Sequence, residues 1–329
     1  MTDFRTIAVI GGAGYVGSRL VPRLLRDGYA VRVLDWYLYG RGVLVPHRAL
    51  QEIQGDVRDA ACVAAVLRGA DAVIHLACIS NDPSFELNPT LGRAVNFESF
   101  APCVAAAKHA QVRRFIYASS SSVYGINDAP HVTESAPLQP LTDYSRYKAA
   151  CEAILRDAQS PDFTTLILRP ATVCGLAPRL RLDLTVNILT AHAVLRDRMT
   201  VFGGTQRRPN LHIDDMVEAY CHALQWDDAQ IAGKTYNVGG ENLTLSAIAE
   251  RVRTIVGDHV AISVEPTTDL RSYHICSERI AEELGFRPSL TVDHAIRDVA
   301  AALRDGRVPD ALTDTRYYNI RAMQAAGLG

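Results

Sequence analysis

Tyr144 and Lys148 have the residue types and the spacing that acid–base chemistry on an alcohol requires. They are four positions apart, so on a helix their side chains lie on one face, about one 5.4 Å turn apart. A phenol has an unperturbed pKa near ~10, and a lysine cation one turn away lowers that pKa because it favours the phenolate. Ser120 offers a hydroxyl that can hydrogen-bond the substrate oxygen whose proton the tyrosine takes or gives. Together these side chains predict the interconversion of an alcohol and a ketone.

A glycine-rich segment near the start of the chain predicts the cofactor for that chemistry. Gly11, Gly14 and Gly17 follow an expected strand at residues 6–10 and open an expected helix. Glycines in this context let the backbone turn tightly and approach a pyrophosphate at the positive end of the helix. Asp35 ends the next expected strand, where its carboxylate can accept hydrogen bonds from the adenosine ribose and would repel a 2′-phosphate. The sequence therefore predicts NAD, rather than NADP, as the cofactor.

The composition gives no sign of a macromolecular or membrane partner. The 329 residues are 48% hydrophobic and 21% charged, as in an ordinary globular protein. With 34 Lys and Arg against 36 Asp and Glu, the net charge is −2, so neither nucleic acid nor an anionic membrane is expected. We expect no signal peptide and no membrane span. The seven cysteines lack metal-ligand spacing, so we expect no metal site, reduced thiols and a cytoplasmic location.

Apolar segments bounded by turn residues alternate with segments of helical periodicity through the first half of the chain. The expected strands are residues 6–10, 30–34, 52–54, 72–76, 115–119 and 165–168, and the expected helices between them include 18–26, 60–67 and 96–109. This alternation predicts right-handed βαβ units. The fold class is therefore α/β, with a Rossmann-type, doubly wound parallel sheet that helices cover on both faces.

After residue 168 the pattern becomes mixed. Helices are expected at about 184–195 and 246–256, and a strand at 235–238. We assign residues 1–169, with about 211–240, to an NAD-binding Rossmann domain. Residues 170–210 and 241–329 then form a smaller, discontinuous substrate-binding lobe. Ligands of open α/β sheets bind outside the carboxyl ends of the strands, so this lobe is expected to close over that edge.

The motifs occur in an order that resembles a known family. They are Gly11-Gly12-Ala13-Gly14-Tyr15-Val16-Gly17, Gly55-Asp56-Val57, His75-Leu76-Ala77, Ser119 to Ser122 with Val123-Tyr124-Gly125, Tyr144-x-x-x-Lys148, Arg169 to Gly175, and Leu211-His212-Ile213-Asp214-Asp215. The ordered set resembles the extended short-chain dehydrogenase/reductases, in their nucleotide-sugar epimerase/dehydratase branch. His75 itself is interpreted as a hydrogen-bonded core or edge histidine and not as a catalyst.

The resemblance implies a role for each matching position. Ser120, Tyr144 and Lys148 match the catalytic hydroxyl residue, tyrosine and lysine of the family. The positions matched to NAD binding are Gly11, Gly14, Tyr15, Val16, Gly17, Asp35, Asp56, Val57, Leu76, Ala77, Tyr144 and Lys148. The positions matched to a nucleotide-diphosphate sugar are Ser120, Ser121, Thr172, Asn187, Arg208 and Arg271. The two arginines would supply charge-assisted hydrogen bonds to a pyrophosphate.

Departures from the family pattern separate the reactions within it. Members that dehydrate sugars carry an acidic pair directly after the catalytic hydroxyl residue. This chain has Ser121 and Ser122 there, which cannot protonate a leaving hydroxyl at neutral pH. Members that epimerise beside a ketone use a cysteine at the position of Ser122. Thr172 and Cys174 replace an asparagine and a tyrosine that are frequent in the family, which leaves the nucleobase and the pocket shape undetermined.

We predict an NAD-dependent nucleotide-sugar epimerase that acts at C4 through a transient 4-keto sugar, with return of the same hydride to its other face. An NAD(P)H-dependent nucleotide-sugar 4-ketoreductase needs the same residues and is the alternative. A non-catalytic NAD-sensing regulator is less favoured, because it would not need Ser120, Tyr144 and Lys148. The sequence identifies neither the nucleobase nor the sugar of the substrate.

Two expected helices predict association. Residues 96–109 and 144–158 carry apolar side chains over more of their circumference than one buried face requires. In the resembled family the corresponding helices pair across a two-fold axis into a four-helix bundle. The resemblance therefore implies a homodimer.

Overall fold

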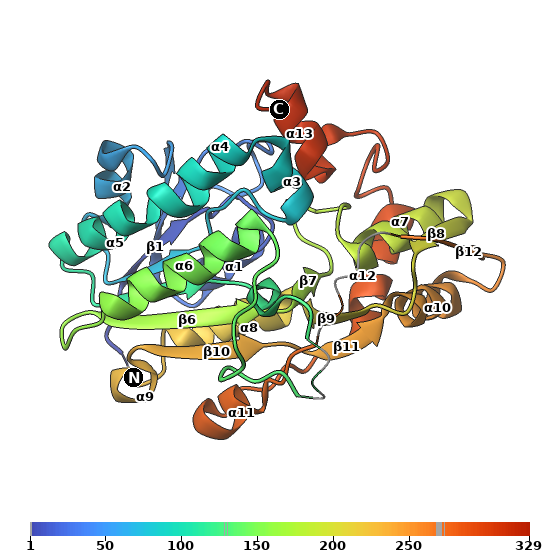
Figure 1. Cartoon of the computed structure of the whole chain (residues 1–329). Coiled ribbons are helices and arrows are strands. Elements are labelled where there is room, and N and C mark those ends of the chain that lie inside the picture. Colours follow the sequence, from blue (N-terminus) through green and yellow to red (C-terminus); the bar gives the residue numbers. More distant parts are fainter. Residues whose placement is uncertain (1, 128, 130, 268–271, 273) are drawn as a thin grey trace.

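A parallel β-sheet forms the centre of the molecule (Figure 1). The computed structural model describes residues 2–127, 129, 131–267, 272 and 274–329. Within these residues the sheet has seven strands: β1 (Thr6–Ile10), β2 (Ala30–Asp35), β3 (Leu50–Gln54), β4 (Ala72–His75), β5 (Arg114–Ala118), β6 (Thr164–Pro170) and β10 (Lys234–Val238). Their order is β10-β6-β5-β4-β1-β2-β3, and neighbouring strands run parallel. The predicted α/β class and doubly wound sheet are confirmed.

Helices cover both faces of this sheet because its strands are apolar on both sides. In β1, Ile7 and Val9 belong to one core, whereas Ala8 and Ile10 belong to the other. The helices α1 (Gly17–Arg26) and α8 (Ile213–Ala223) contribute to the first core, and α2 (Ala60–Leu67), α5 (Phe100–His109) and α6 (Asp143–Asp157) contribute to the second. Shorter helical elements are α3 (Asp82–Leu87), α4 (Pro89–Arg93), the π-helical turn η1 (Ala94–Glu98), the 3-10 turn η2 (Ser121–Tyr124) and α9 (Asp228–Ile231). None of the helices in the described part of the chain is long and apolar enough to cross a membrane.

The second lobe is built from short strands and three longer helices. Its strands are β7 (Thr172–Cys174), β8 (Arg198–Phe202), β9 (Arg207–His212), β11 (Glu241–Thr244) and β12 (Ala261–Glu265), arranged as the sheets β11-β9-β7 and β12-β8. The helices α7 (Thr185–Arg196), α10 (Leu245–Val256) and α12 (Val292–Arg304) share a core that includes Leu189, Ile248 and Ile296. Sequence patterning did not predict these strands, because they are short and several of them are rich in polar or exposed residues: β9 begins Arg-Arg-Pro, and most of β12 is exposed.

The end of the chain returns to the lobe that contains the central sheet (Figure 1). Helix α11 (Glu278–Leu284) packs on β10, and its Ile280 is buried in the core beneath α8. After the 3-10 turn η3 (Thr315–Tyr317), helix α13 (Asn319–Ala325) contacts α3. Its Met323 is fully buried in the core that α2, α5 and α6 share. Residues 241–329, which we assigned to the second lobe as one segment, thus divide their contacts between both lobes.

The docking of α13 predicts a cost for shortening Met323. Replacing it by alanine should lower the free energy of unfolding by about 2–4 kcal/mol, because a buried methionine loses its packing and leaves a cavity. Gln324→Ala is the matched control, since Gln324 is exposed on the same helix. Urea unfolding of both variants measures the difference. Equal stability of the two variants would show that the tail does not pack into this core.

Candidate active site

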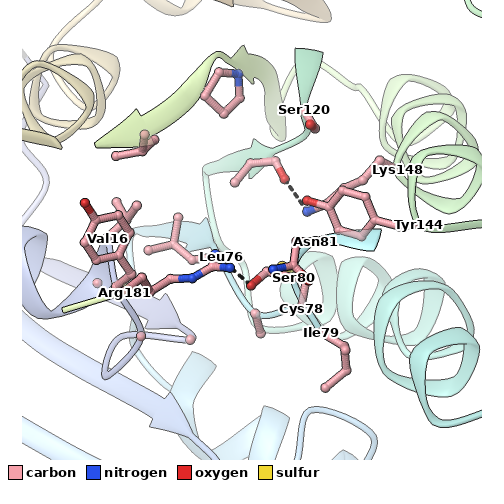
Figure 2. Close-up of a pocket in the computed structure, with 18 of the residues that line it drawn as sticks. Val16, Leu76, Cys78, Ile79, Ser80, Asn81, Ser120, Tyr144, Lys148 and Arg181 are labelled. Carbon is pink, nitrogen blue, oxygen red and sulfur yellow. Dashed lines mark hydrogen bonds between the residues drawn. The ribbon is translucent and has the colours of Figure 1, made fainter. Parts of the chain in front are cut away.

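A cleft of about 450 Å³ opens at the carboxyl edge of the central sheet (Figure 2). It lies next to the point where the strand order reverses between β1 and β4, which is where open α/β sheets bind their ligands. Its walls come from the glycine-rich turn, from the segments that follow β2, β4 and β5, from the first turns of α6 and from β7 in the second lobe. Both lobes therefore contribute to one site.

The glycine-rich turn between β1 and α1 admits no side chains at two of its positions. Gly11 has a φ of +88°, and a Cβ atom there would lie 2.6 Å from the backbone nitrogen of Ala77. At Gly17, a Cβ atom would lie 2.5 Å from the carbonyl oxygen of Gly12. The turn stays tight, and no side chain of these two glycines lies between the positive end of α1 and the cleft. This cradle fits the pyrophosphate of a dinucleotide.

Asp35 lies at the end of β2, beside this turn. Its Oδ2 accepts a hydrogen bond from the Ala13 backbone nitrogen at 2.8 Å, and its Oδ1 accepts one from Tyr37 at 2.7 Å. Burial raises the pKa of Asp35, although these hydrogen bonds oppose the shift. An ionised carboxylate has about four acceptor positions, so two remain for ribose hydroxyls. The geometry suits the role predicted for this residue.

The remaining positions matched to NAD also line the cleft. They are Gly14, Tyr15, Val16, Asp56, Val57, Leu76 and Ala77. The side chain of Asp56 accepts hydrogen bonds from Arg58, with a shortest distance of 2.6 Å. Partial burial acts to raise the pKa of Asp56, but the Arg58 hydrogen bonds outweigh it and lower that pKa. The negative charge of Asp56 is thereby held at the edge of the site.

Ser120, Tyr144 and Lys148 meet in the same cleft, although they come from two elements (Figure 2). The side chain of Thr142 caps α6, so Tyr144 lies in the first turn of that helix. The Nζ of Lys148 donates to the Ala118 carbonyl at 2.6 Å and lies 5.8 Å from the centre of the Tyr144 ring. The hydroxyl of Ser120 lies 2.8 Å from that of Ser122. A cation is thus fixed next to the phenol, as the predicted acid–base chemistry requires.

A buried ion pair that the sequence analysis missed holds α6 in place. Glu152 is fully buried on α6 and accepts hydrogen bonds from Arg169 on β6 at 2.9 and 2.6 Å. It also accepts one from the hydroxyl of Ser119, next to Ser120. The sequence offered only a carboxylate one turn after Lys148, and its partner Arg169 lies on a different element.

Four of the positions matched to the substrate line the cleft, and one of them is Ser120. Ser121 follows Ser120, Thr172 lies in β7, and Arg208 lies in β9 of the second lobe. Arg271 falls outside the described residues. Serine, threonine and arginine residues from both lobes therefore line the same cleft as Tyr144.

Asn187 is placed differently, because it is fully buried and does not line the cleft. Its Oδ1 accepts from the Gly175 nitrogen at 2.9 Å, and its Nδ2 donates to the Arg181 carbonyl at 2.8 Å. The hydroxyl of Tyr15 donates to the Gly175 carbonyl at 2.6 Å, and burial raises the pKa of this phenol. Asn187 thus organises the segment after β7, and direct contact with a substrate would require these hydrogen bonds to break.

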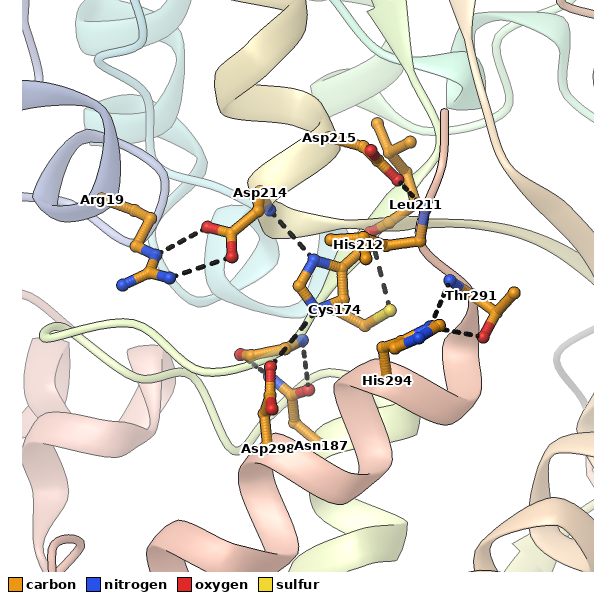
Figure 3. A network of polar contacts seen from close by, with 12 residues as sticks. Arg19, Cys174, Asn187, Leu211, His212, Asp214, Asp215, Thr291, His294 and Asp298 are labelled. Atoms are coloured by element: carbon orange, nitrogen blue, oxygen red, sulfur yellow. Dashed lines mark hydrogen bonds and ion pairs between the residues drawn. The ribbon is translucent and has the colours of Figure 1, made fainter. Parts of the chain in front are cut away.

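Polar contacts join the two lobes beneath that segment (Figure 3). Arg19 on α1 forms an ion pair with Asp214 on α8 at 2.6 Å, and the Asp214 nitrogen donates to Nδ1 of His212. The other ring nitrogen of His212 lies 3.6 Å from the carboxylate of Asp298 on α12. Cys174 is buried next to this network, and burial raises the pKa of its thiol to about 12. Its packing is that of a structural thiol.

Residues 7–239 match the sequence profile described as the NAD dependent epimerase/dehydratase family. The chain belongs to this family. The resemblance indicated by the motifs is therefore confirmed, and so is NAD as the cofactor. This epimerase/dehydratase family member is an NAD-dependent enzyme of the extended short-chain dehydrogenase/reductase type. Within the described residues, no group of three or more His, Cys, Asp and Glu side chains could hold a metal ion.

Relatives of this family member include both epimerases and dehydratases. The chain is 28% identical over 305 residues to a UDP-glucose 4-epimerase from Lactobacillus helveticus, covering 86% of this chain and 92% of the relative. It is also 28% identical to a dTDP-glucose 4,6-dehydratase from Streptomyces niveus, covering 92% and 93% of the two chains. A solved structure of the dTDP-glucose 4,6-dehydratase DesIV from Streptomyces venezuelae, with NAD bound, has a TM-score of 0.83 at 25% identity, covering 92% of this chain and 98% of that one. Similarity of this kind does not choose between the two reactions.

His75 lies in the core behind this site, in an aromatic environment. It is 3% exposed, and its ring centre lies 5.3 Å from that of Phe100 and 5.9 Å from that of Phe115. Neither ring nitrogen has a hydrogen-bond partner among the described residues, so the expectation of a hydrogen-bonded histidine is wrong in that respect. Burial, followed by the positive charge of Lys148, lowers the pKa of His75 to about 3.

The low pKa of His75 predicts a pH-dependent effect of replacing it. In the unfolded chain a histidine gains a proton near pH ~6.5, whereas native His75 remains neutral down to about pH 3. Native stability therefore falls as the pH drops through this interval, because only the unfolded state binds the proton. Between pH 7 and 5, the free energy of unfolding should therefore fall by about 2 kcal/mol less in His75→Phe than in the wild type. Urea unfolding at both pH values tests this, and an equal loss in wild type and variant would contradict it.

Proposed function

We propose that the enzyme is a nucleotide-sugar 4-epimerase, and one observation carries the proposal. The cleft brings Ser120, Tyr144 and Lys148 together, while Ser121 and Ser122 occupy the positions where dehydrating members carry acids. An alcohol–ketone step is therefore provided for, but protonation of a leaving hydroxyl from these positions is not. Relatives that match most of the chain include UDP-glucose 4-epimerases, so the reaction is one that such relatives are named for.

In the proposed mechanism the chain handles the proton and the orientation of the sugar. Bound NAD supplies the hydride acceptor, and afterwards the hydride donor, at C4. Tyr144 as phenolate takes the proton of the C4 hydroxyl, and the charge of Lys148 favours that phenolate. Ser120 hydrogen-bonds the C4 oxygen as it becomes a carbonyl. The 4-keto sugar then turns within the cleft, and Tyr144 returns the proton when the opposite C4 configuration forms.

The diphosphate of the substrate would lie towards the second lobe. Arg208 on β9 lines the cleft there, and a guanidinium suits bidentate recognition of phosphate oxygens. Thr172 on β7 offers a hydroxyl on the same side. We assign these two residues, with Ser121, to a nucleotide-diphosphate sugar, and Arg271 remains a prediction from the resemblance.

Tyr144→Phe should lower kcat by about 10²–10⁴-fold, because the variant keeps the ring but loses the proton-transfer group. Tyr147→Phe is the matched control, since Tyr147 lies on the same helix and its ring stacks on Phe97 at 5.1 Å. The control should keep wild-type turnover. Steady-state rates on the nucleotide sugar that the wild-type enzyme epimerises provide the measurement. Near-normal turnover of Tyr144→Phe would remove this tyrosine from the mechanism.

An NMR assay in D₂O separates the epimerase from its alternative. The enzyme is offered nucleotide sugars and their 4-keto forms, first without added cofactor and then with NAD(H) or NADPH. Inversion at C4 without deuterium on carbon and without lasting reduction of the nicotinamide is the expected result. Stoichiometric use of reduced cofactor by a 4-keto sugar, with no inversion of the parent sugar, would make the enzyme a 4-ketoreductase.

We also propose that the enzyme is a homodimer through α5 and α6. These helices pack beside each other on one face of the sheet (Figure 1). Both expose small apolar residues to the outside, including Ala101 and Ala105 on α5 and Ala153 on α6. Such faces can pair with their copies across a two-fold axis into a four-helix bundle.

Light scattering at micromolar concentration should give the mass of a dimer. Ala153→Glu should shift the protein to monomers, because a carboxylate would be buried without a partner at the interface. Ala301→Glu on α12 is the control, since Ala301 is exposed on a helix of the second lobe. A monomeric wild-type protein would remove the proposal.

We place the enzyme in the cytoplasm. All seven cysteines are free thiols, and Cys103, Cys151, Cys174 and Cys221 are buried. Unpaired thiols in this number suit a reducing compartment.

A further inference from the structure

The segment between β7 and α7 brings part of the second lobe onto the glycine-rich turn. Gly175, at its start, accepts the hydrogen bond from the Tyr15 hydroxyl at 2.6 Å. Further along, the backbone nitrogen of Arg179 donates to the hydroxyl of Ser18 at 3.1 Å. Tyr15 and Ser18 flank the start of α1. The segment therefore lies against the end of the helix where a dinucleotide diphosphate binds.

Arg181 in this segment is buried and lines the cleft. Its side chain is 7% exposed and runs from the neighbourhood of Val16 towards Ser80 (Figure 2). Its Nε donates to Asp183 at 2.9 Å, and its Nη1 donates to the Ser80 hydroxyl at 3.1 Å. The buried Nη2 has no hydrogen-bond partner among the described residues. One donor nitrogen of a guanidinium in the cleft wall is thus unused.

Arg179 lies towards the adenosine side of the same cleft. It is 3% exposed, and its guanidinium carbon lies 3.8 Å from the centre of the Tyr39 ring. Its Nη2 donates to Oδ1 of Asn319 at 2.5 Å, while its buried Nε has no partner in the described part of the chain. Its charge also acts on the carboxylate of Asp35. Burial, followed by the neighbouring charge of Arg181, lowers the pKa of Arg179 to about 10.

Between β7 and α7, the two guanidiniums that line the cleft carry more positive charge than the one carboxylate of this segment in the lining balances. Asp183 forms an ion pair with Arg181, but no carboxylate of the described residues lies within ion-pair distance of Arg179. A buried cation without a counter-charge is unfavourable, and a bound anion removes that penalty. We propose that Arg179 and Arg181 bind the diphosphate of the dinucleotide from the second lobe, opposite the glycine-rich turn. The cofactor would then be held by both lobes.

The contacts of the segment favour the cofactor's diphosphate over that of the substrate. The charge of Arg179 acts on Asp35, which is predicted to bind the adenosine ribose. The backbone nitrogen of Arg179 donates to Ser18, which directly follows the glycine-rich turn predicted to bind the pyrophosphate. Arg208, the cation assigned to the substrate, comes from a different element of the second lobe. A clamp on the cofactor slows its release until the lobes separate, which suits a reaction that regenerates its cofactor in every cycle.

Ligand truncation tests the clamp without measuring turnover. The full-length protein is freed of nucleotide, and calorimetry gives the Kd of ADP, adenosine and UDP for wild type, Arg179→Met and Arg181→Met. Each variant should raise the Kd of ADP by about tenfold or more, because it loses charge-assisted hydrogen bonds to phosphate. The Kd values of adenosine and UDP should stay within about twofold, since these ligands do not use the clamp. Arg297→Met, which removes an exposed arginine of α12, is the control for net charge and should match wild type.

Several results would overturn the proposal. They are an unchanged Kd of ADP in both variants, an equal weakening of ADP and adenosine, and a selective weakening of UDP, which would assign the arginines to the substrate. Thermal unfolding, measured without and with NAD, distinguishes a cofactor-binding arginine from a structural one. Arg179→Met should keep or raise the Tm of the free protein and reduce the Tm gain on adding NAD. If Arg179 were merely structural, its replacement would lower the Tm of the free protein and leave the Tm gain unchanged. If the methionine variants do not fold, Arg179→Lys and Arg181→Lys retain the charge but lose the forked donors, and they should weaken ADP binding and spare adenosine.

Because no turnover enters these measurements, their failure would leave the 4-epimerase proposal standing. Failure of the epimerase assay would likewise leave the clamp intact.

Discussion

The buried pair of Glu152 and Arg169 is the interaction on which the geometry of the site depends. It joins α6, which carries Tyr144 and Lys148, to the carboxyl end of β6. The same carboxylate accepts a hydrogen bond from Ser119, the residue before Ser120. Both residues are 3% exposed or less, and a charge pair so buried is stable only if its donors and acceptors form hydrogen bonds. Here both carboxylate oxygens of Glu152 accept hydrogen bonds from Arg169. The proton-transfer group and the hydroxyl that faces it are thus positioned by one shared carboxylate.

A second constraint arises where the lobes meet. The glycine-rich turn leaves bare backbone at the start of α1, and the segment after β7 covers it from the other lobe. That segment carries more positive charge than its carboxylate balances, in a place shielded from water. The first lobe supplies backbone dipoles and the second supplies side-chain cations, so the diphosphate would complete the junction between them. Cofactor retention and lobe packing then depend on the same contacts.

The central sheet was accessible from sequence because buried parallel strands are continuous apolar segments. β1 begins and ends at the predicted residues, Thr6 and Ile10, and α2 at Ala60 and Leu67. The second lobe was not accessible in this way. Its strands are short and some of them are polar, as in β9, and their pairing joins distant segments such as β11 with β9. Likewise, nothing in the local pattern around Met323 indicates that the tail packs against the NAD-binding domain.

The sequence by itself determined the groups whose relation is local. Tyr144 and Lys148 share a helix face because four residues make about one turn, and Gly11 to Gly17 shape one turn of backbone. Only the tertiary structure decided which distant partners these groups receive. Glu152 pairs with Arg169, and Arg179 and Arg181 line the cofactor cleft, although the sequence alone indicates only surface charges. Asn187 hydrogen-bonds the segment after β7, although the resemblance implied a contact with the substrate. The physical reason is that burial and pairing of charged groups depend on the path of the chain in space, which periodicity and spacing do not encode.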